Sequence, residues 1–159
     1  MSAGHDDLVA ALTGGGIVTR ILEARAGAPV RAERIAVDAM AAAPGDVRAR
    51  LAVGAGEPLA CRRVRLVAAG RVLSEAVNWF VPGRLSAAMR DMLDATDTPF
   101  GLAIAPLAPY RETLAVDRLG GGPAILHVAA LVRGGDGTPL ADVSETYFAA
   151  ALGERGDAR

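Results

Sequence analysis

The sequence predicts an α+β fold in which helices cover a single antiparallel β-sheet. Residues 59–82 and 124–152 each have the pattern of a β-hairpin, because two extended segments flank a short glycine-containing turn, at 68–70 and at 134–137. Apolar residues recur with helical spacing before the first hairpin and again between the two. Strands in adjacent antiparallel pairs, with helices kept apart from them, are typical of the α+β class.

The composition is that of a soluble globular domain. The 159 residues are 52% hydrophobic and 22% charged, with a net charge of −1. We expect one domain over 1–159, with an ordered core over residues 6–152. The balanced charge and the 4% aromatic content argue against a nucleic-acid partner. No apolar run approaches the roughly 18 residues that span a membrane, so no membrane partner is expected.

The cysteine and histidine content restricts covalent and metal chemistry. Cys61 is the single cysteine, so it has no internal disulfide partner, and two histidines are too few for a metal cluster. The first twelve residues carry acids instead of a basic segment before an apolar core, which is unlike a secretory signal. We therefore expect a cytoplasmic protein without a bound metal.

The first third of the chain predicts two helices, a strand and a helical turn. Asp6 is a candidate cap for a helix that runs through Leu12, and the glycine triplet at 14–16 then breaks it. Apolar spacing predicts a second helix over 18–25, which Gly27 ends. The elements expected next are a strand at 30–40 and a helical turn at 46–53.

Between the two hairpins the sequence predicts two more helices and a strand. A helix is expected at 84–94, with one buried face made by Leu85, Met89, Met92 and Leu93. A turn entering a short helix is expected within 96–109, capped by Asp97 or Thr98. Residues 110–116 are a strand candidate, and the last strand of the second hairpin is expected to cover 140–152.

The phase of the first hairpin singles out one arginine. Side chains alternate between the two faces of a strand, so Arg62 shares a face with Val64 and Leu66, while Arg63 and Arg65 share the other. Val64 and Leu66 are the better core pair. We therefore expect Arg62 to point into the protein interior.

Glu145 is placed in the same way on the last strand, in phase with Val143 and Tyr147. Two interpretations remain open. Arg62 and Glu145 form a buried salt bridge with a structural role, because removing one member of such a pair costs about 3–5 kcal/mol. Alternatively they border a pocket, where Arg62 binds a ligand carboxylate on two hydrogen bonds and Glu145 binds a hydroxyl or acts as an acid or base.

Nucleophilic catalysis has little support in the sequence. Cys61 is in antiphase to Arg62 and has no histidine nearby in the chain, although the two arginines that follow it could lower its pKa. Ser144 points to the face opposite Glu145, and no Gly-x-Ser-x-Gly elbow is present. His127 lies in an apolar run, which is more typical of a core histidine than of a base.

Several short motifs, taken in order, resemble the chorismate lyase (chorismate pyruvate-lyase) family and, more distantly, the UTRA domains that share its fold. They are Val-Thr-Arg-Ile-Leu-Glu at 18–23, Gly-x-Pro-Val at 27–30, Arg-Arg-Val-Arg-Leu at 62–66, Thr-Pro-Phe-Gly at 98–101 and Ser-Glu-Thr-Tyr-Phe at 144–148. The resemblance covers most of residues 13–150. It implies a six-stranded antiparallel sheet flanked by helices, with helix–turn–helix flaps over the ligand.

The resemblance also implies a function and a set of site residues. Enzymes of that family eliminate pyruvate from chorismate to leave 4-hydroxybenzoate, without a cofactor. Arg62 would hold the ring carboxylate as a catalytic residue, and Glu145 would face the hydroxyl or ether oxygen. The remaining substrate-binding residues implied are Val18, Thr19, Asn78, Phe100 and Gly101, with backbone N–H groups near Val18 and Phe100 completing the carboxylate site.

One departure from the family leaves the function open. Family members tend to carry further arginines on the strand before the last hairpin turn, whereas residues 125–132 contain no cation. Chorismate has two carboxylates, so a lyase with Arg62 alone would hold it poorly. The alternatives are an enzyme of the same fold with another carboxylated ring substrate, or a UTRA-like domain that binds a small molecule without catalysis. We expect a monomer or a homodimer.

Overall fold

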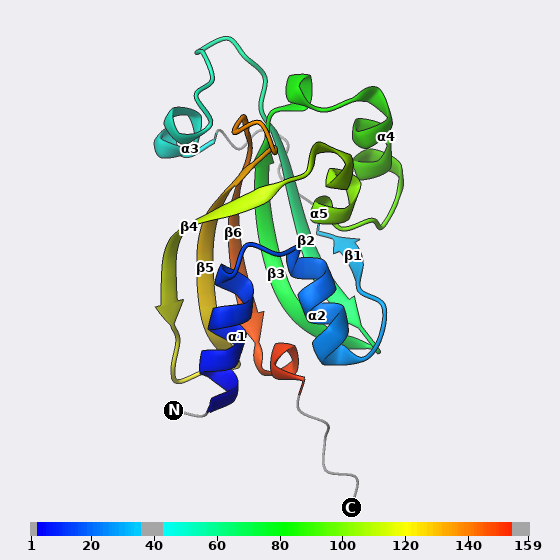
Figure 1. The fold of residues 1–159 in the computed structure, drawn as a ribbon, viewed down its shortest axis with the longest axis vertical. Coiled ribbons are helices and arrows are strands. Elements are labelled where there is room, and N and C mark those ends of the chain that lie inside the picture. The colour runs from blue at the N-terminus through cyan, green and yellow to red at the C-terminus, as the bar shows by residue number, and fades with distance from the viewer. Residues whose placement is uncertain (1–2, 36–42, 154–159) are drawn as a thin grey trace, which may run out of the picture.

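A six-stranded antiparallel sheet forms the centre of the protein in the computed structural model, which describes residues 3–35 and 43–153 (Figure 1). The strands are β1 (Arg31–Arg34), β2 (Ala60–Ala68), β3 (Arg71–Phe80), β4 (Tyr110–Arg118), β5 (Ala124–Arg133) and β6 (Pro139–Phe148). Their order across the sheet is β1-β2-β3-β6-β5-β4. This arrangement confirms the predicted α+β class with one antiparallel sheet of six strands.

Helices are short and most of them lie on one side of the sheet (Figure 1). They are α1 (Ala3–Thr13), α2 (Val18–Ala26), α3 (Gly45–Arg50), α4 (Ala87–Ala95) and α5 (Phe100–Ala103), with 3₁₀ turns at Pro82–Arg84, Ala105–Leu107 and Ala149–Leu152. No helix within the described residues has both the length and the apolar character that crossing a membrane requires.

Strand boundaries differ from the predicted ones at two places. The strand expected at 30–40 is β1, which ends at Arg34, and residues 36–40 of that prediction lie outside the described residues. The last strand, expected over 140–152, ends at Phe148, and Ala149–Leu152 forms a 3₁₀ turn. Alanine has little preference for extended backbone, and Gly153 closes the turn in the left-handed region with φ 71°.

The helix after the first hairpin begins later than predicted. Ser86 caps α4 by accepting a hydrogen bond from the Met89 N–H at 3.2 Å, so the helix starts at Ala87 instead of residue 84. Leu85, Met89 and Leu93 face the sheet, but Met92 is 38% exposed, so its expected burial is wrong. Neither predicted residue caps α5, since Pro99 occupies that position with extended backbone.

Three apolar clusters surround the sheet. The first packs α1 and α2, through residues such as Leu12 and Leu22, onto one face of the sheet. The second packs α4 and α5 onto the same face, nearer the other end of the strands, and includes Phe100 and Ile104. The third includes Val47 of α3, Leu51 directly after α3, and Leu131 of β5. The candidate site lies on this sheet face between the first and second clusters, a region that we call the seam, and residues of both clusters line it.

Candidate functional site

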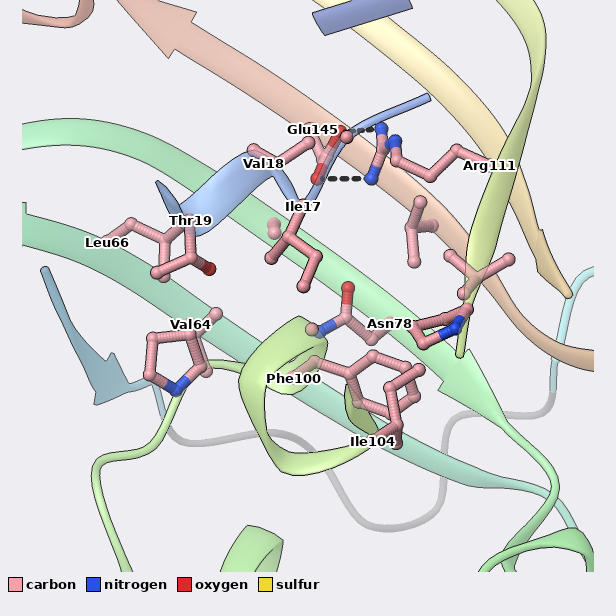
Figure 2. A pocket seen from close by; sticks show the side chains of 17 residues that line it. Ile17, Val18, Thr19, Val64, Leu66, Asn78, Phe100, Ile104, Arg111 and Glu145 are labelled. Carbon is pink, nitrogen blue, oxygen red and sulfur yellow. Dashed lines mark hydrogen bonds and ion pairs between the residues drawn. The ribbon is translucent and has the colours of Figure 1, made fainter. Parts of the chain in front are cut away.

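A small cavity of about 60 Å³, partly open to solvent, lies between the sheet and the starts of α2 and α5 (Figure 2). Residues of both apolar clusters contribute to its wall. The lining residues are Gly16, Ile17, Val18, Thr19, Val64, Leu66, Ala76, Asn78, Pro99, Phe100, Gly101, Ile104, Pro109, Arg111, Val132, Val143 and Glu145. Its largely apolar wall, with a few polar groups, is typical of a small-molecule site.

The register of the sheet brings the polar wall residues together. β3 and β6 are neighbours, with Ala76 opposite Glu145 and Asn78 opposite Val143, so Asn78 and Glu145 lie two rows apart on one face. Arg111 comes from the edge strand β4 and extends over β5 to reach Glu145. Thr19 comes from the first turn of α2. Four elements distant in sequence therefore supply the polar groups.

Arg111 and Glu145 form a buried ion pair at the cavity wall. Nη1 of Arg111 donates to Oε2 of Glu145 at 3.2 Å, and Nη2 donates to Oε1 (Figure 2). The side chains are 10% and 8% exposed. The Tyr147 hydroxyl also donates to Oε1, at 2.9 Å. Oε1 thus accepts two hydrogen bonds and Oε2 one, which leaves Oε2 with more free acceptor capacity.

The environment of the ion pair keeps both of its donors protonated. Burial lowers the pKa of Arg111, but the charge and hydrogen bonds of Glu145 outweigh this, so the pKa is raised overall. Burial raises the pKa of Tyr147 well above its ordinary value, and the Glu145 charge raises it further. The guanidinium and the phenol therefore stay as hydrogen-bond donors to Glu145 at neutral pH.

Two uncharged polar side chains point into the cavity without a protein partner. Asn78 and Thr19 are 5% and 4% exposed, and neither side chain makes a hydrogen bond to any described residue. Figure 2 shows the Asn78 carboxamide between the Arg111–Glu145 pair and the Phe100 ring. Their polar atoms keep some access to the cavity, whereas the fully buried polar atoms without a partner among the described residues are Nε of Arg62, Oγ of Ser74 and Nε of Arg111. A ligand or ordered water in the cavity would supply the hydrogen bonds that Asn78 and Thr19 lack.

Arg62 is buried as predicted, at 5% exposure, but it is not among the cavity-lining residues. Its Nη1 donates to the Thr98 carbonyl at 2.9 Å and its Nη2 to the Thr96 carbonyl at 3.3 Å. Of the two interpretations left open, the salt bridge between Arg62 and Glu145 is wrong, because these carbonyls bind the Arg62 guanidinium while Arg111 pairs with Glu145. Burial, followed by the nearby charge of Arg34, lowers the pKa of Arg62 to about 10.

The other predicted site residues all line the cavity. They are Val18, Thr19, Asn78, Phe100, Gly101 and Glu145. Gly101 allows α5 to approach the start of α2, since a Cβ there would lie 3.3 Å from Cγ2 of Ile17. The structure thus places these residues around one space, and their contacts with a ligand stay a prediction.

Arg111 is the site residue that sequence reasoning missed. Alternation on β4 places it in phase with Thr113, but no residue of that strand is fully buried, so no apolar partner marks the inward face. The edge position and the irregularity between Thr113 and Ala115 weaken the pattern further. The available signal was a cation on the strand that follows Pro109, one strand before the segment 125–132 where the family resemblance implies further arginines.

The nucleophile candidates lie away from the cavity. Ser144 is on the sheet face opposite Glu145, and its hydroxyl is 2.8 Å from Nε2 of His127, which is partly exposed and not a core residue. Burial raises the pKa of the Cys61 thiol despite the opposing effect of Arg63, so no activated thiolate is formed there. No group of three or more metal-ligating side chains occurs within residues 3–35 and 43–153.

Comparison with solved structures relates this fold to effector domains of bacterial regulators. The effector domain of PhnF from Mycobacterium smegmatis matches 86% of this chain and 90% of its own length, with a TM-score of 0.62 and 13% identity. The chain covers 65% of the longer PhnF structure. The ligand-binding domain of a protein described as a GntR-family regulator, from Bordetella bronchiseptica, has a TM-score of 0.56 and 14% identity over 77% of this chain and 84% of its own.

Comparison of sequences finds one curated relative, and no family model matches the chain. The uncharacterized protein y4mC of Sinorhizobium fredii (strain NBRC 101917 / NGR234) is 37% identical over 123 residues. The match covers 64% of this chain and 52% of y4mC, so the chain spans about half the length of that relative. On the structural evidence, the chain has the chorismate lyase/UTRA-like fold found in GntR-family effector domains.

Proposed function

We propose that this chain is a UTRA-like small-molecule-binding domain, which binds its ligand in the Arg111–Glu145 cavity without catalysing a reaction. The observation that carries the proposal is the pair of buried polar side chains, Asn78 and Thr19, that line the cavity and make no hydrogen bond to any described residue. The likeness to effector and ligand-binding domains supports it. A domain that works by binding needs no activated nucleophile or metal. Its placement in the cytoplasm stays a prediction.

One part of the cavity wall is apolar and could pack against the body of a bound molecule, and another part carries polar groups that could bind its edge. Phe100, Ile104 and Val132 would pack against a ring. The Asn78 carboxamide both donates and accepts hydrogen bonds, and the Thr19 hydroxyl does the same. The first N–H groups of α2 add donors near Val18, since the cap residue Ile17 supplies no side-chain acceptor.

The second candidate is the lyase reaction, in which pyruvate is eliminated from chorismate. One observation favours it: the Glu145 carboxylate lines the cavity, where it could act on a bound ether oxygen. The charges disfavour it. Within the described lining, Arg111 is the single cation and is already paired with Glu145. Two carboxylates of chorismate would have to share that one guanidinium.

An assay with chorismate separates the two candidates. Purified protein is incubated with chorismate, and the release of pyruvate and 4-hydroxybenzoate is followed over time. We expect no release above the uncatalysed rate. The control is Glu145→Gln, which keeps the shape of the side chain but removes its charge. Pyruvate release by the wild type that is lost in Glu145→Gln would contradict the binding function and establish the lyase.

A further inference from the structure

The charge of the cavity wall indicates what kind of molecule it accepts. Among the described residues that line it, Arg111 and Glu145 are the charged ones, and they face each other on two hydrogen bonds. Their charges cancel, so the wall carries no net charge. Arg62 does not change this balance, since the Thr96 and Thr98 carbonyls hold its guanidinium outside the lining.

An anionic ligand that used the terminal nitrogens of Arg111 would have to compete with Glu145. Glu145 already occupies both terminal nitrogens of the guanidinium, and the Tyr147 hydroxyl fixes the carboxylate in place. A ligand carboxylate at Arg111 would lie beside the Glu145 carboxylate, which is 8% exposed. Like charges repel strongly there, and one guanidinium cannot satisfy two carboxylates equally well.

An uncharged ligand meets the groups that are left without partners. The Asn78 carboxamide and the Thr19 hydroxyl need both a donor and an acceptor, and Oε2 of Glu145 has room for another donor. Hydroxyl or primary amide groups provide both in one small unit. The apolar remainder of the wall suits a single ring.

Building on the binding function above, we propose that the ligand is an uncharged ring compound with hydroxyl or amide groups at one edge, and that Glu145 is the residue that excludes anions. Glu145 thereby acts as a specificity-determining residue. It neutralises the cation that would otherwise attract carboxylates and accepts a hydrogen bond from a ligand donor.

The test uses two probes of nearly equal shape that differ in charge, 4-hydroxybenzamide and 4-hydroxybenzoate. Their dissociation constants are measured by ligand-observed NMR up to millimolar concentration, for the wild type and for Glu145→Gln. We expect the wild type to bind the amide at least about tenfold more tightly than the carboxylate. In Glu145→Gln the wall gains a net positive charge, so the preference should reverse.

A matched control is Glu75→Gln on β3. Glu75 also pairs with an arginine, Arg65, at 2.9 Å, but the pair is exposed and Glu75 does not line the cavity. This variant should keep the wild-type preference. Equal or tighter binding of the carboxylate by the wild type would overturn the exclusion of anions and leave the binding function intact. Failure of the wild type to bind either probe would overturn both.

Discussion

Asn78 is buried where the folded protein gives its side chain no hydrogen-bond partner among the described residues. A core position on a central strand is normally apolar, because an unpaired carboxamide there opposes folding. Such a residue is expected where a ligand completes its hydrogen bonds. Asn78 therefore lowers the stability of the ligand-free protein but provides hydrogen bonds to a ligand, as residues of functional sites commonly do.

Replacing Asn78 by Leu should raise stability and abolish binding. Leu has a similar volume and no polar atoms, so the ligand-free protein should gain about 1–2 kcal/mol in free energy of unfolding. Chemical denaturation measures this gain, and NMR titration with 4-hydroxybenzamide measures the loss of binding. Ser74→Ala is the matched control: the Ser74 hydroxyl is also buried without a partner but does not line the cavity.

The control should also become more stable, yet keep its affinity for the probe. A destabilised Asn78→Leu protein would show that Asn78 has a structural role instead. Unchanged probe affinity in Asn78→Leu would show that its carboxamide takes no part in binding.

Single residues were predictable where alternation had apolar neighbours to fix its phase. Glu145 is in phase with Val143 and Tyr147, and all three are buried. The same rule placed Arg62 correctly inside the protein but could not say which acceptors it meets, because these are carbonyls over thirty positions away in the chain. Arg111 lies on an edge strand on which no residue is fully buried, so alternation could not show which face of that strand points inward.

At the scale of elements, Arg62 anchors the segment that leads into α5. Its two hydrogen bonds hold the Thr96 and Thr98 carbonyls, and Pro99 follows as the cap of the helix that carries Phe100 and Gly101. α5 has a single turn, so it depends on such contacts for its position. Arg62 therefore supports the cavity wall from outside the cavity.

Replacing Arg62 by Leu should loosen α5. Loss of the two part-buried hydrogen bonds should lower the free energy of unfolding by about 1–3 kcal/mol. Hydrogen exchange of the Leu102 and Ala103 amides, which bond to the Pro99 carbonyl, should become faster. The control is Arg65→Leu on the same strand, because Arg65 is exposed and its pair with Glu75 contributes little.

Protection of those amides at the wild-type level in Arg62→Leu would rule out this anchoring role.

The boundaries of the helices and strands were also only partly predictable from the sequence. Hairpins and helices with strong turn signals were predicted near their observed positions, whereas the start of α4 depended on a cap, Ser86, that the apolar pattern does not reveal.

At the scale of the whole molecule, the cavity results from two apolar clusters that share one sheet face. α1 and α2 belong to one cluster and α4 and α5 to the other. The pairing of β3 with β6 then carries Asn78 and Glu145 into the seam between them. Local periodicity predicted both hairpins, but their pairing is a long-range contact that periodicity does not encode, so the six-stranded sheet was expected through the family resemblance.

The central claim is that a small molecule binds in this seam, and an NMR titration of isotope-labelled protein with 4-hydroxybenzamide tests it most directly. We predict saturable shifts of the Asn78 side-chain amide and of the Thr19 backbone amide, with the outward-facing Arg63 and Ser144 unaffected. Shifts confined to that outward face, or no saturable shift at millimolar probe, would contradict the account.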